Sequence, residues 1–163
     1  MAEAFNDKTL PAQKEARYRE VADEIASVLA GEPNLTARMA TVASMLASSF
    51  DHYFWTGFYV VDGEDELVVG PYQGTLGCLR IAFGRGVCGT AAAQRRTQLV
   101  EDVHAFPGHI ACDSRSQSEV VVPVFDKDGE LIAVFDVDSD RPAAFDETDA
   151  RWLERILHET FAR

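Results

Sequence analysis

Trp55-Thr56-Gly57-Phe58-Tyr59-Val60-Val61 is typical of a β-strand, because aromatic and β-branched side chains pack well on a half-buried sheet. The turn-forming cluster Asp62-Gly63-Glu64-Asp65 follows it, and residues 67–72 make a second strand-like run. Two such runs separated by a short polar turn predict a β-hairpin. We therefore expect antiparallel sheet at the centre of the fold.

A second hairpin is predicted further along the chain. Residues 120–125 and 131–138 are rich in apolar and β-branched side chains, and the turn cluster Asp126-Lys127-Asp128-Gly129 separates them. Short strands are also expected at 79–83 and 97–100. The sheet is thus predicted to contain about six strands.

Helices are expected on both sides of these hairpins. The first carries an apolar stripe of Val21, Ile25, Val28 and Leu29. The predicted helices cover 11–30, 35–49 with Asn34 as N-cap, 89–95, and a last segment that begins after the N-cap residue Asp146. Terminal helices around hairpins predict an α+β fold, with the N- and C-terminal helices packed on one face of the sheet. We predict one domain over residues 11–163, preceded by a flexible N-terminus at residues 1–10.

The composition excludes several classes of function. The chain has 163 residues, with 15 Lys and Arg against 27 Asp and Glu, so its net charge is -12. This charge repels phosphate backbones and anionic lipids, and we expect neither a nucleic-acid partner nor a membrane partner. The first seven residues are polar and acidic, unlike a secretory signal, and no apolar run is long enough to cross a bilayer. A cytoplasmic protein is therefore expected.

The three cysteines are Cys78, Cys88 and Cys112. An odd number excludes a fully paired secreted framework and leaves thiol chemistry open, although a free cysteine is often only a small buried apolar residue. The gaps of 10 and 24 residues do not match the paired spacing of zinc motifs, and His109 is the only close ligand partner of Cys112. We therefore expect no metal site.

Acidic and aromatic residues share predicted strand faces. In a strand over 131–138, Asp136 and Asp138 point to the same side, and Glu119 stands at the start of the neighbouring strand. Close carboxylates repel one another, so one of them can hold a proton near neutral pH and act as an acid. The alternative for each is a solvated strand end. Trp55 and Tyr59, four residues apart, also share a face, and a thiol beside an acid suits the reduction of an oxygenated substrate.

Two motif matches are set aside. Gly84-Arg85-Gly86-Val87-Cys88-Gly89 fits the dinucleotide-binding pattern G-x-G-x-x-G, but its neighbours form hairpins rather than βαβ units. It favours a tight turn into a short helix, whose free N–H groups can bind a small anion such as a substrate carboxylate. A calcium loop starting at Asp136 is excluded because its sixth position is Arg141 instead of glycine.

Several motifs together resemble the free methionine-(R)-sulfoxide reductases, which are GAF-domain enzymes acting on free rather than protein-bound methionine sulfoxide. The resemblance covers residues 11–160, and its most specific part is Pro107–Asp113, which ordinary GAF sensors lack. The motifs are Trp55-x-Gly57-Phe58-Tyr59, Val69-Gly70-Pro71-Tyr72-Gln73-Gly74, Gly84-Arg85-Gly86-Val87-Cys88-Gly89, Phe106-Pro107-Gly108-His109-Ile110-Ala111-Cys112-Asp113, Ser116-x-Ser118-Glu119, Val122-Pro123-Val124 and Asp136-x-Asp138-Ser139.

The resemblance implies a role for each candidate residue. Cys112 matches the catalytic cysteine, Cys78 the principal resolving cysteine and Cys88 a further redox-active thiol. The substrate-binding residues that it implies are Trp55, Tyr59, Glu119, Asp136 and Asp138. The family's reaction passes through a sulfenic acid and an intramolecular disulfide. No bound cofactor is implied: thioredoxin, with NADPH and thioredoxin reductase, is the external reductant, and a homodimer and a role under oxidative stress are expected.

Two other classes of function compete with this interpretation. A non-catalytic GAF sensor would bind a small ligand or report oxidation through its thiols, but such sensors usually adjoin an output domain, and we expect 163 residues to leave no room for one. A thiol-rich structural or interaction protein would have no use for a row of acids. A reductase is therefore the favoured prediction.

Overall fold

The computed structural model describes residues 11–110 and 112–163, and the predicted flexible segment 1–10 lies outside the described residues. Six strands form a single antiparallel sheet in the order β3-β2-β1-β6-β5-β4. The strands are β1 (Trp55–Val61), β2 (Glu66–Gln73), β3 (Arg80–Ala82), β4 (Gln98–Val100), β5 (Ser118–Phe125) and β6 (Leu131–Ser139). This arrangement confirms the predicted α+β fold with its two hairpins.

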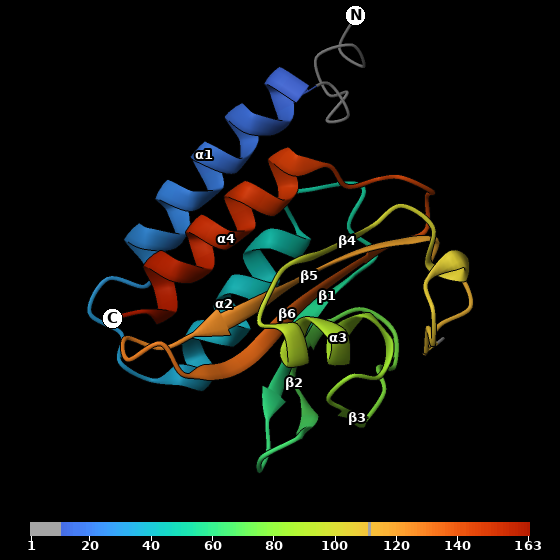
Figure 1. Cartoon of the computed structure of the whole chain (residues 1–163). Helices are drawn as coiled ribbons and strands as arrows, with labels where there is room; N and C mark the ends of the chain where they lie inside the picture. Colours follow the sequence, from blue (N-terminus) through green and yellow to red (C-terminus); the bar gives the residue numbers. More distant parts are fainter. Residues whose placement is uncertain (1–10, 111) are drawn as a thin grey trace, which may run out of the picture.

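Helices α1 (Pro11–Val28), α2 (Leu35–Ala47) and α4 (Glu147–Phe161) cover one face of the sheet (Figure 1). Their apolar side chains meet Phe58 of β1 and Phe135 of β6, whose rings lie 4.9 Å apart and are fully buried. Of the predicted apolar stripe, Val21, Ile25 and Leu29 are buried, whereas Val28 is 61% exposed. The main hydrophobic core therefore lies on this side of the sheet.

Both predicted N-caps are present. Asn34 accepts a hydrogen bond from the Ala37 amide at 2.9 Å, and Asp146 accepts hydrogen bonds from the amides of Thr148 and Asp149. The Asp149 carboxylate in turn accepts a hydrogen bond from the Asp146 amide, which completes a capping box. Capping satisfies amides at the start of each helix that have no partner within it.

The opposite face of the sheet carries α3 (Gly86–Gln94) and the loops around it. The helix begins three residues before the predicted start, because the turn from Gly84 to Gly89 is continuous with it and the Gly84 amide donates to the Gly89 carbonyl. A side chain at Gly89 would lie 2.4 Å from the Ala82 carbonyl oxygen, so glycine allows α3 to pack closely on β3. The predicted tight turn into a short helix is confirmed.

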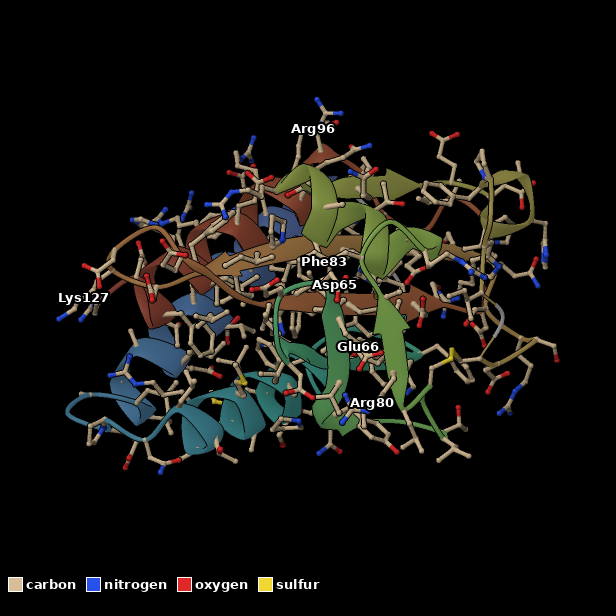
Figure 2. All side chains as sticks on the ribbon, turned by 60° about the horizontal axis from the view of Figure 1, so that its bottom comes forward. Asp65, Glu66, Arg80, Phe83, Arg96 and Lys127 are labelled. Carbon is tan, nitrogen blue, oxygen red and sulfur yellow. A yellow bond between two sulfur atoms is a disulfide. The ribbon has the colours of Figure 1, made fainter. Side chains whose placement is uncertain are left out.

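The far edge of the sheet is closed by the short strand β3 lying along β2 (Figure 2). The Phe83 amide donates to the Asp65 carbonyl, and Arg80 forms ion pairs with Glu66 at 2.6 Å and Asp62 at 2.7 Å. A charged pair on a short edge strand discourages pairing with another chain. This edge leads directly into α3.

A buried polar network joins α1, α4 and the segment before β1. Asp149, which is inaccessible to solvent, accepts hydrogen bonds from Lys14 Nζ at 2.7 Å and Tyr18 Oη at 2.6 Å, and His52 Nε2 lies 3.0 Å from it. Burial alone raises the pKa of Asp149, but hydrogen bonds from His52, Lys14 and Tyr18 outweigh it and lower this pKa to about 2. The ionised carboxylate is thus part of the folded state.

Asp149→Asn should destabilise the fold by about 3–5 kcal/mol, because it removes the buried partner of the Lys14 ammonium at 2.7 Å and leaves only the longer pair with Asp146 at 3.5 Å. The folded-state pKa lies below the ordinary value of about 4, so this stabilisation is present above that pH and is lost as the pH falls toward 2. Urea unfolding at pH 7 measures the loss, and the difference between variant and wild type should shrink in acid. Glu159→Gln, in an exposed pair with Arg155, should change stability by less than about 0.5 kcal/mol. Equal stability of wild type and Asp149→Asn would contradict the assignment.

None of the helices in the described ranges is long and apolar enough to cross a membrane.

Candidate active site

A pocket opens on the α3 side of the sheet and encloses about 530 Å³, counting the part that is open to solvent. Its floor is formed by β1, β5 and β6, one wall by the start of α3, and its rim by the segments that carry Leu76 and Cys112. The lining residues are Trp55, Tyr59, Leu76, Gly77, Ile81, Arg85, Gly86, Val87, Cys88, His109, Ile110, Cys112, Asp113, Ser116, Glu119, Asp136 and Asp138. Cysteines, acids and aromatic rings therefore line the same pocket.

Strand register places the three acids together. Glu119 of β5 is paired with Asp138 of β6, which is paired on its other side with Trp55 of β1. Asp136 lies two residues earlier on β6 and therefore faces the same side. Phe135 and Val137 point into the core on the opposite face. Alternation along β6 thus puts apolar side chains in the core and carboxyls in the pocket.

The carboxyl groups in this row are harder to ionise than isolated ones. Burial, followed by the charges of Asp136 and Asp138, raises the pKa of Glu119 well above its ordinary value. Burial and the charge of Asp136 likewise raise the pKa of Asp138. Burial raises the pKa of Asp136 to about 6, although Glu119 and Cys88 donate hydrogen bonds that partly offset it. The row can therefore hold protons near neutral pH and release one to a substrate.

Aromatic rings form the wall next to the acids. The rings of Trp55 and Tyr59 are stacked with centroids 5.6 Å apart, and Tyr72 also stacks with Trp55 at 5.0 Å. A side chain at Gly57 would lie 2.2 Å from Tyr72 Cβ, so glycine there lets Tyr72 come close enough to stack. Trp55 Nε1 donates to the Thr75 carbonyl at 2.8 Å. The wall is apolar and held in one orientation.

Two of the three cysteines form a disulfide at the rim. Cys78 and Cys112 are bonded, with their Cα atoms 5.5 Å apart, and Cys112 is the more exposed of the two. Cys88 is free and 5% exposed, and it lies on α3 beneath the rim. Burial, followed by the charges of Asp136 and Glu119, raises the pKa of the Cys88 thiol well above its ordinary value. Cys78 and Cys112 are therefore the bonded pair in this structure, while Cys88 faces the acids.

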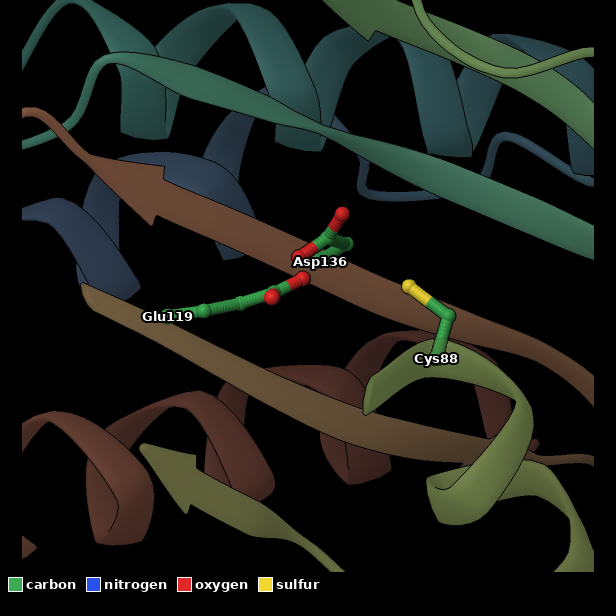
Figure 3. A group of neighbouring side chains, drawn as sticks. All are labelled: Cys88, Glu119 and Asp136. Atoms are coloured by element: carbon green, nitrogen blue, oxygen red, sulfur yellow. The ribbon is translucent and has the colours of Figure 1, made fainter. Parts of the chain in front are cut away.

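Cys88 converges with two of the acids on one point (Figure 3). Its sulfur and one carboxylate oxygen each from Glu119 and Asp136 all lie within 4.8 Å of one another, and all three residues are buried. In the described part of the chain, Asp136 Oδ1 has no hydrogen-bond partner. These residues could hold a cation, because no ion pair in the described residues neutralises Glu119, Asp136 or Asp138.

A hydrogen bond ties the two cysteine-bearing segments together. Thr75 Oγ1 donates a hydrogen bond to Asp113 Oδ2 at 2.7 Å. Thr75 lies three residues before Cys78, and Asp113 directly follows Cys112. Arg115 pairs with Asp113 at 2.9 Å and lies over the Phe54 ring. Hydrogen bonds from Arg115 and Thr75 hold the pKa of Asp113 well below its usual range, so this carboxylate is ionised. The contact joins the same two segments as the disulfide.

Thr75→Val should make the disulfide easier to reduce, because it removes this contact of the oxidised form. We expect the equilibrium constant for disulfide formation, measured against a dithiol redox buffer, to fall about threefold to tenfold, the effect of one net hydrogen bond. Thr97→Val is a matched control, since Thr97 also donates to an exposed carboxylate, Glu154 Oε1, at 2.6 Å. An unchanged equilibrium in Thr75→Val, or an equal change in the control, would contradict this.

The structure brings the predicted residues together. Seven of the eight line the pocket, and Cys78 joins them through its bond to Cys112. Sequence reasoning missed the roles of Thr75, Tyr72 and Asp113. Asp113 belongs to the Pro107–Asp113 motif, and Tyr72 lies in the second strand of the first hairpin. Only the folded structure shows that Asp113 contacts Thr75 and that Tyr72 stacks on Trp55.

The GAF domain family matches residues 34–160. GAF domain-containing protein A of Dictyostelium discoideum is 50% identical over 144 residues, 88% of this chain and 90% of that protein. Free methionine-R-sulfoxide reductase of Escherichia coli is 40% identical over 140 residues, 86% of this chain and 84% of that protein. The structure of free methionine-R-sulfoxide reductase from Neisseria meningitidis in complex with its substrate has a TM-score of 0.85 and 52% identity, and covers 91% of this chain and 90% of that chain. The family match includes every pocket residue.

Proposed function

Because this chain belongs to the GAF-domain family of free methionine-R-sulfoxide reductases, we propose that it reduces free L-methionine-(R)-S-oxide to L-methionine with Cys112 as the attacking thiolate. The observation that carries the proposal is the placement of Cys112 on the rim of a pocket whose floor holds three acids with raised pKa values. A reductase needs both groups: a nucleophile for sulfur and a proton source for the departing oxygen.

Substrate recognition uses opposite ends of the amino acid. The carboxyl groups of Glu119, Asp136 and Asp138 bind the ammonium group, and Asp136 Oδ1 has a free acceptor site for it. The stacked ring of Trp55 packs against the S-methyl group. Backbone N–H groups at the start of α3 hold the substrate carboxylate. A peptide-bound methionine sulfoxide lacks both free charges, which explains a preference for the free amino acid.

In the chemical step, the Cys112 sulfur attacks the sulfoxide sulfur, and a carboxylic acid in the row protonates the oxygen. The oxygen is transferred to Cys112, which becomes a sulfenic acid, and methionine leaves. The cysteine sulfur loses two electrons and the substrate sulfur gains them. Glu119 is the proposed proton donor, since burial and the charges of both other acids raise the pKa of its carboxyl group.

Regeneration uses the second thiol. The Cys78 thiol attacks the sulfenic acid, water leaves, and the Cys78–Cys112 disulfide forms. Thioredoxin reduces this disulfide, with electrons supplied from NADPH by thioredoxin reductase. Cys88 is a further redox-active thiol, secondary to Cys78 in resolving the sulfenic acid. The partly exposed position of the disulfide supports access by an external dithiol.

The reaction uses no bound cofactor or metal, the catalytic unit spans residues 11–163, and the family suggests a homodimer, which light scattering on the purified protein tests. Dependence on thioredoxin and NADPH fits action in the cytoplasm during oxidative stress.

A coupled assay tests the function. The oxidation of NADPH by thioredoxin reductase and thioredoxin is followed with free L-methionine-(R)-S-oxide, the S diastereomer and a peptide containing methionine sulfoxide. We expect turnover with the free R form and little with the other two substrates. No turnover of the R form would remove the enzyme assignment and favour a GAF sensor.

A further inference from the structure

Cys88, Glu119 and Asp136 come from three different elements, yet their side chains point toward one another (Figure 3). Cys88 lies on α3, Glu119 on β5 and Asp136 on β6. One sulfur and two carboxylate oxygens lie within 4.8 Å of one another. All three residues line the solvent-open pocket, so a small ion can reach them without unfolding the domain.

This cluster has no positive partner among the described residues. The ion pairs in that part of the chain involve other acids, although Glu119 and Asp136 are only 5% and 4% exposed. Asp136 Oδ1 is buried without a hydrogen-bond partner. An unpaired buried acceptor costs free energy, and a metal ion that binds to protonated ligands displaces their protons. The cluster therefore has an unused capacity to bind a cation.

The sulfur ligand decides which cation fits best. An ammonium group needs only oxygen acceptors and gains little from a thiol, whereas Zn²⁺ binds cysteine sulfur and carboxylate oxygen together. Mg²⁺ and Ca²⁺ prefer oxygen alone. Asp138, paired in register with Glu119, is placed to provide a further oxygen. The geometry points to a Zn²⁺ site formed by Cys88, Glu119 and Asp136 inside the substrate pocket.

Zn²⁺ bound there is an inhibitor and not a cofactor. This part of the inference rests on the proposed function, in which Glu119 and Asp136 bind the substrate ammonium. The ion and the substrate then need the same two carboxylates, so binding is mutually exclusive. Sequence spacing gave no sign of this site, because its ligands lie 31 and 17 residues apart and meet only through packing of α3 on the sheet.

The oxidised protein isolates the site. With Cys78 and Cys112 joined as a disulfide, Cys88 is the one thiol left, so any thiolate–metal bond must use it. Cd²⁺ is added as a probe and its ultraviolet thiolate charge-transfer absorption is recorded; Zn²⁺ alone is then titrated by calorimetry. We expect one ion per chain and a clear charge-transfer band.

Three variants decide the assignment. Cys88→Ser should lose the band and weaken Zn²⁺ binding by more than the roughly 10–100-fold that loss of an outer-shell partner costs. Asp136→Asn should keep the thiol but weaken Zn²⁺ binding. His104→Gln is the control for zinc held by the adjacent rings of His104 and His109, and it should leave binding unchanged. Absence of the band in the wild type, or Zn²⁺ binding that survives Cys88→Ser, would overturn the site.

Single-turnover reduction by pre-reduced enzyme tests the competition. Zn²⁺ should raise the substrate concentration needed for half-maximal rate and leave the rate at saturating substrate unchanged. Since the absorption band does not depend on turnover, the two proposals fail separately: a band without turnover removes the reductase, and turnover without a band removes the zinc site.

Discussion

Cys112→Ser should abolish single-turnover reduction of methionine sulfoxide. A serine hydroxyl is a weak nucleophile at neutral pH and has no sulfur to oxidise, so it cannot accept the substrate oxygen as a sulfenic acid. We expect the amount of methionine formed per pre-reduced enzyme to fall to the uncatalysed background, a loss of at least about 10,000-fold in rate. Rapid quenching followed by chromatographic detection of methionine measures this without thioredoxin.

Cys78→Ser is the matched control, because Cys78 is the other half of the same disulfide. This variant should form one methionine per chain and then stop, since its sulfenic acid has lost the principal resolving thiol. Thioredoxin-dependent turnover should fall sharply. Full turnover would instead assign the resolving role to Cys88, which requires movement of α3, where Cys88 is buried. A full single turnover in Cys112→Ser would refute the assignment of the nucleophile.

Glu119→Gln should lower the single-turnover rate about 100-fold to 10,000-fold, the usual contribution of a general acid. Glutamine keeps the size of the side chain and can still accept a hydrogen bond, but it cannot protonate the sulfoxide oxygen. Methionine, the product of the proposed reaction, should still bind with an affinity within a small factor of that of the wild type, because Asp136 and Asp138 remain to hold the ammonium group. If Glu119→Gln lowers the affinity for methionine and the single-turnover rate by the same factor, Glu119 acts in substrate recognition alone.

The pH profile gives an independent check on this acid. The pKa of Glu119 is raised, so its protonated form persists to higher pH than in an ordinary glutamate, and the rate should fall as the pH rises through that value. Asp136, with a pKa of about 6, adds a second transition. Because the titrations of these acids are coupled, the pH profile reports apparent pKa values of the whole cluster and not of a single residue. Glu119→Gln should flatten the alkaline limb; an unchanged limb would move the proton donor to Asp138.

Alternation and capping made much of the fold predictable. The period of two along 131–138 is enough to place Asp136 and Asp138 on one face, because adjacent residues of a strand point to opposite sides. Asn34 and Asp146 are typical N-cap residues, and both cap helices. Trp55 and Tyr59 follow the same rule on β1, which explains why the aromatic wall was also predicted.

Sequence patterns could not predict contacts between segments that lie far apart along the chain. The approach of Cys88 to Asp136 depends on how α3 packs on β6, and no local period encodes this. The Thr75–Asp113 bond joins loops 38 residues apart, whose course is set by the folded strands around them. The pairing of Cys78 with Cys112 followed only from the resemblance to a family. Sequence patterns specify which face a side chain takes, whereas packing specifies its neighbours across the fold.

The two faces of the sheet separate stability from chemistry. The large core and the Asp149 network lie on the side of α1, α2 and α4, whereas the acids, thiols and aromatic wall lie on the side of α3. For protein engineering, this means that substitutions in the acid row of the pocket leave the larger core untouched, whereas substitutions at Trp55, Tyr59 or Val87 also alter the apolar cluster on the side of α3. The same separation gives evolution a route from one ligand to another by substitutions on a single surface of the sheet.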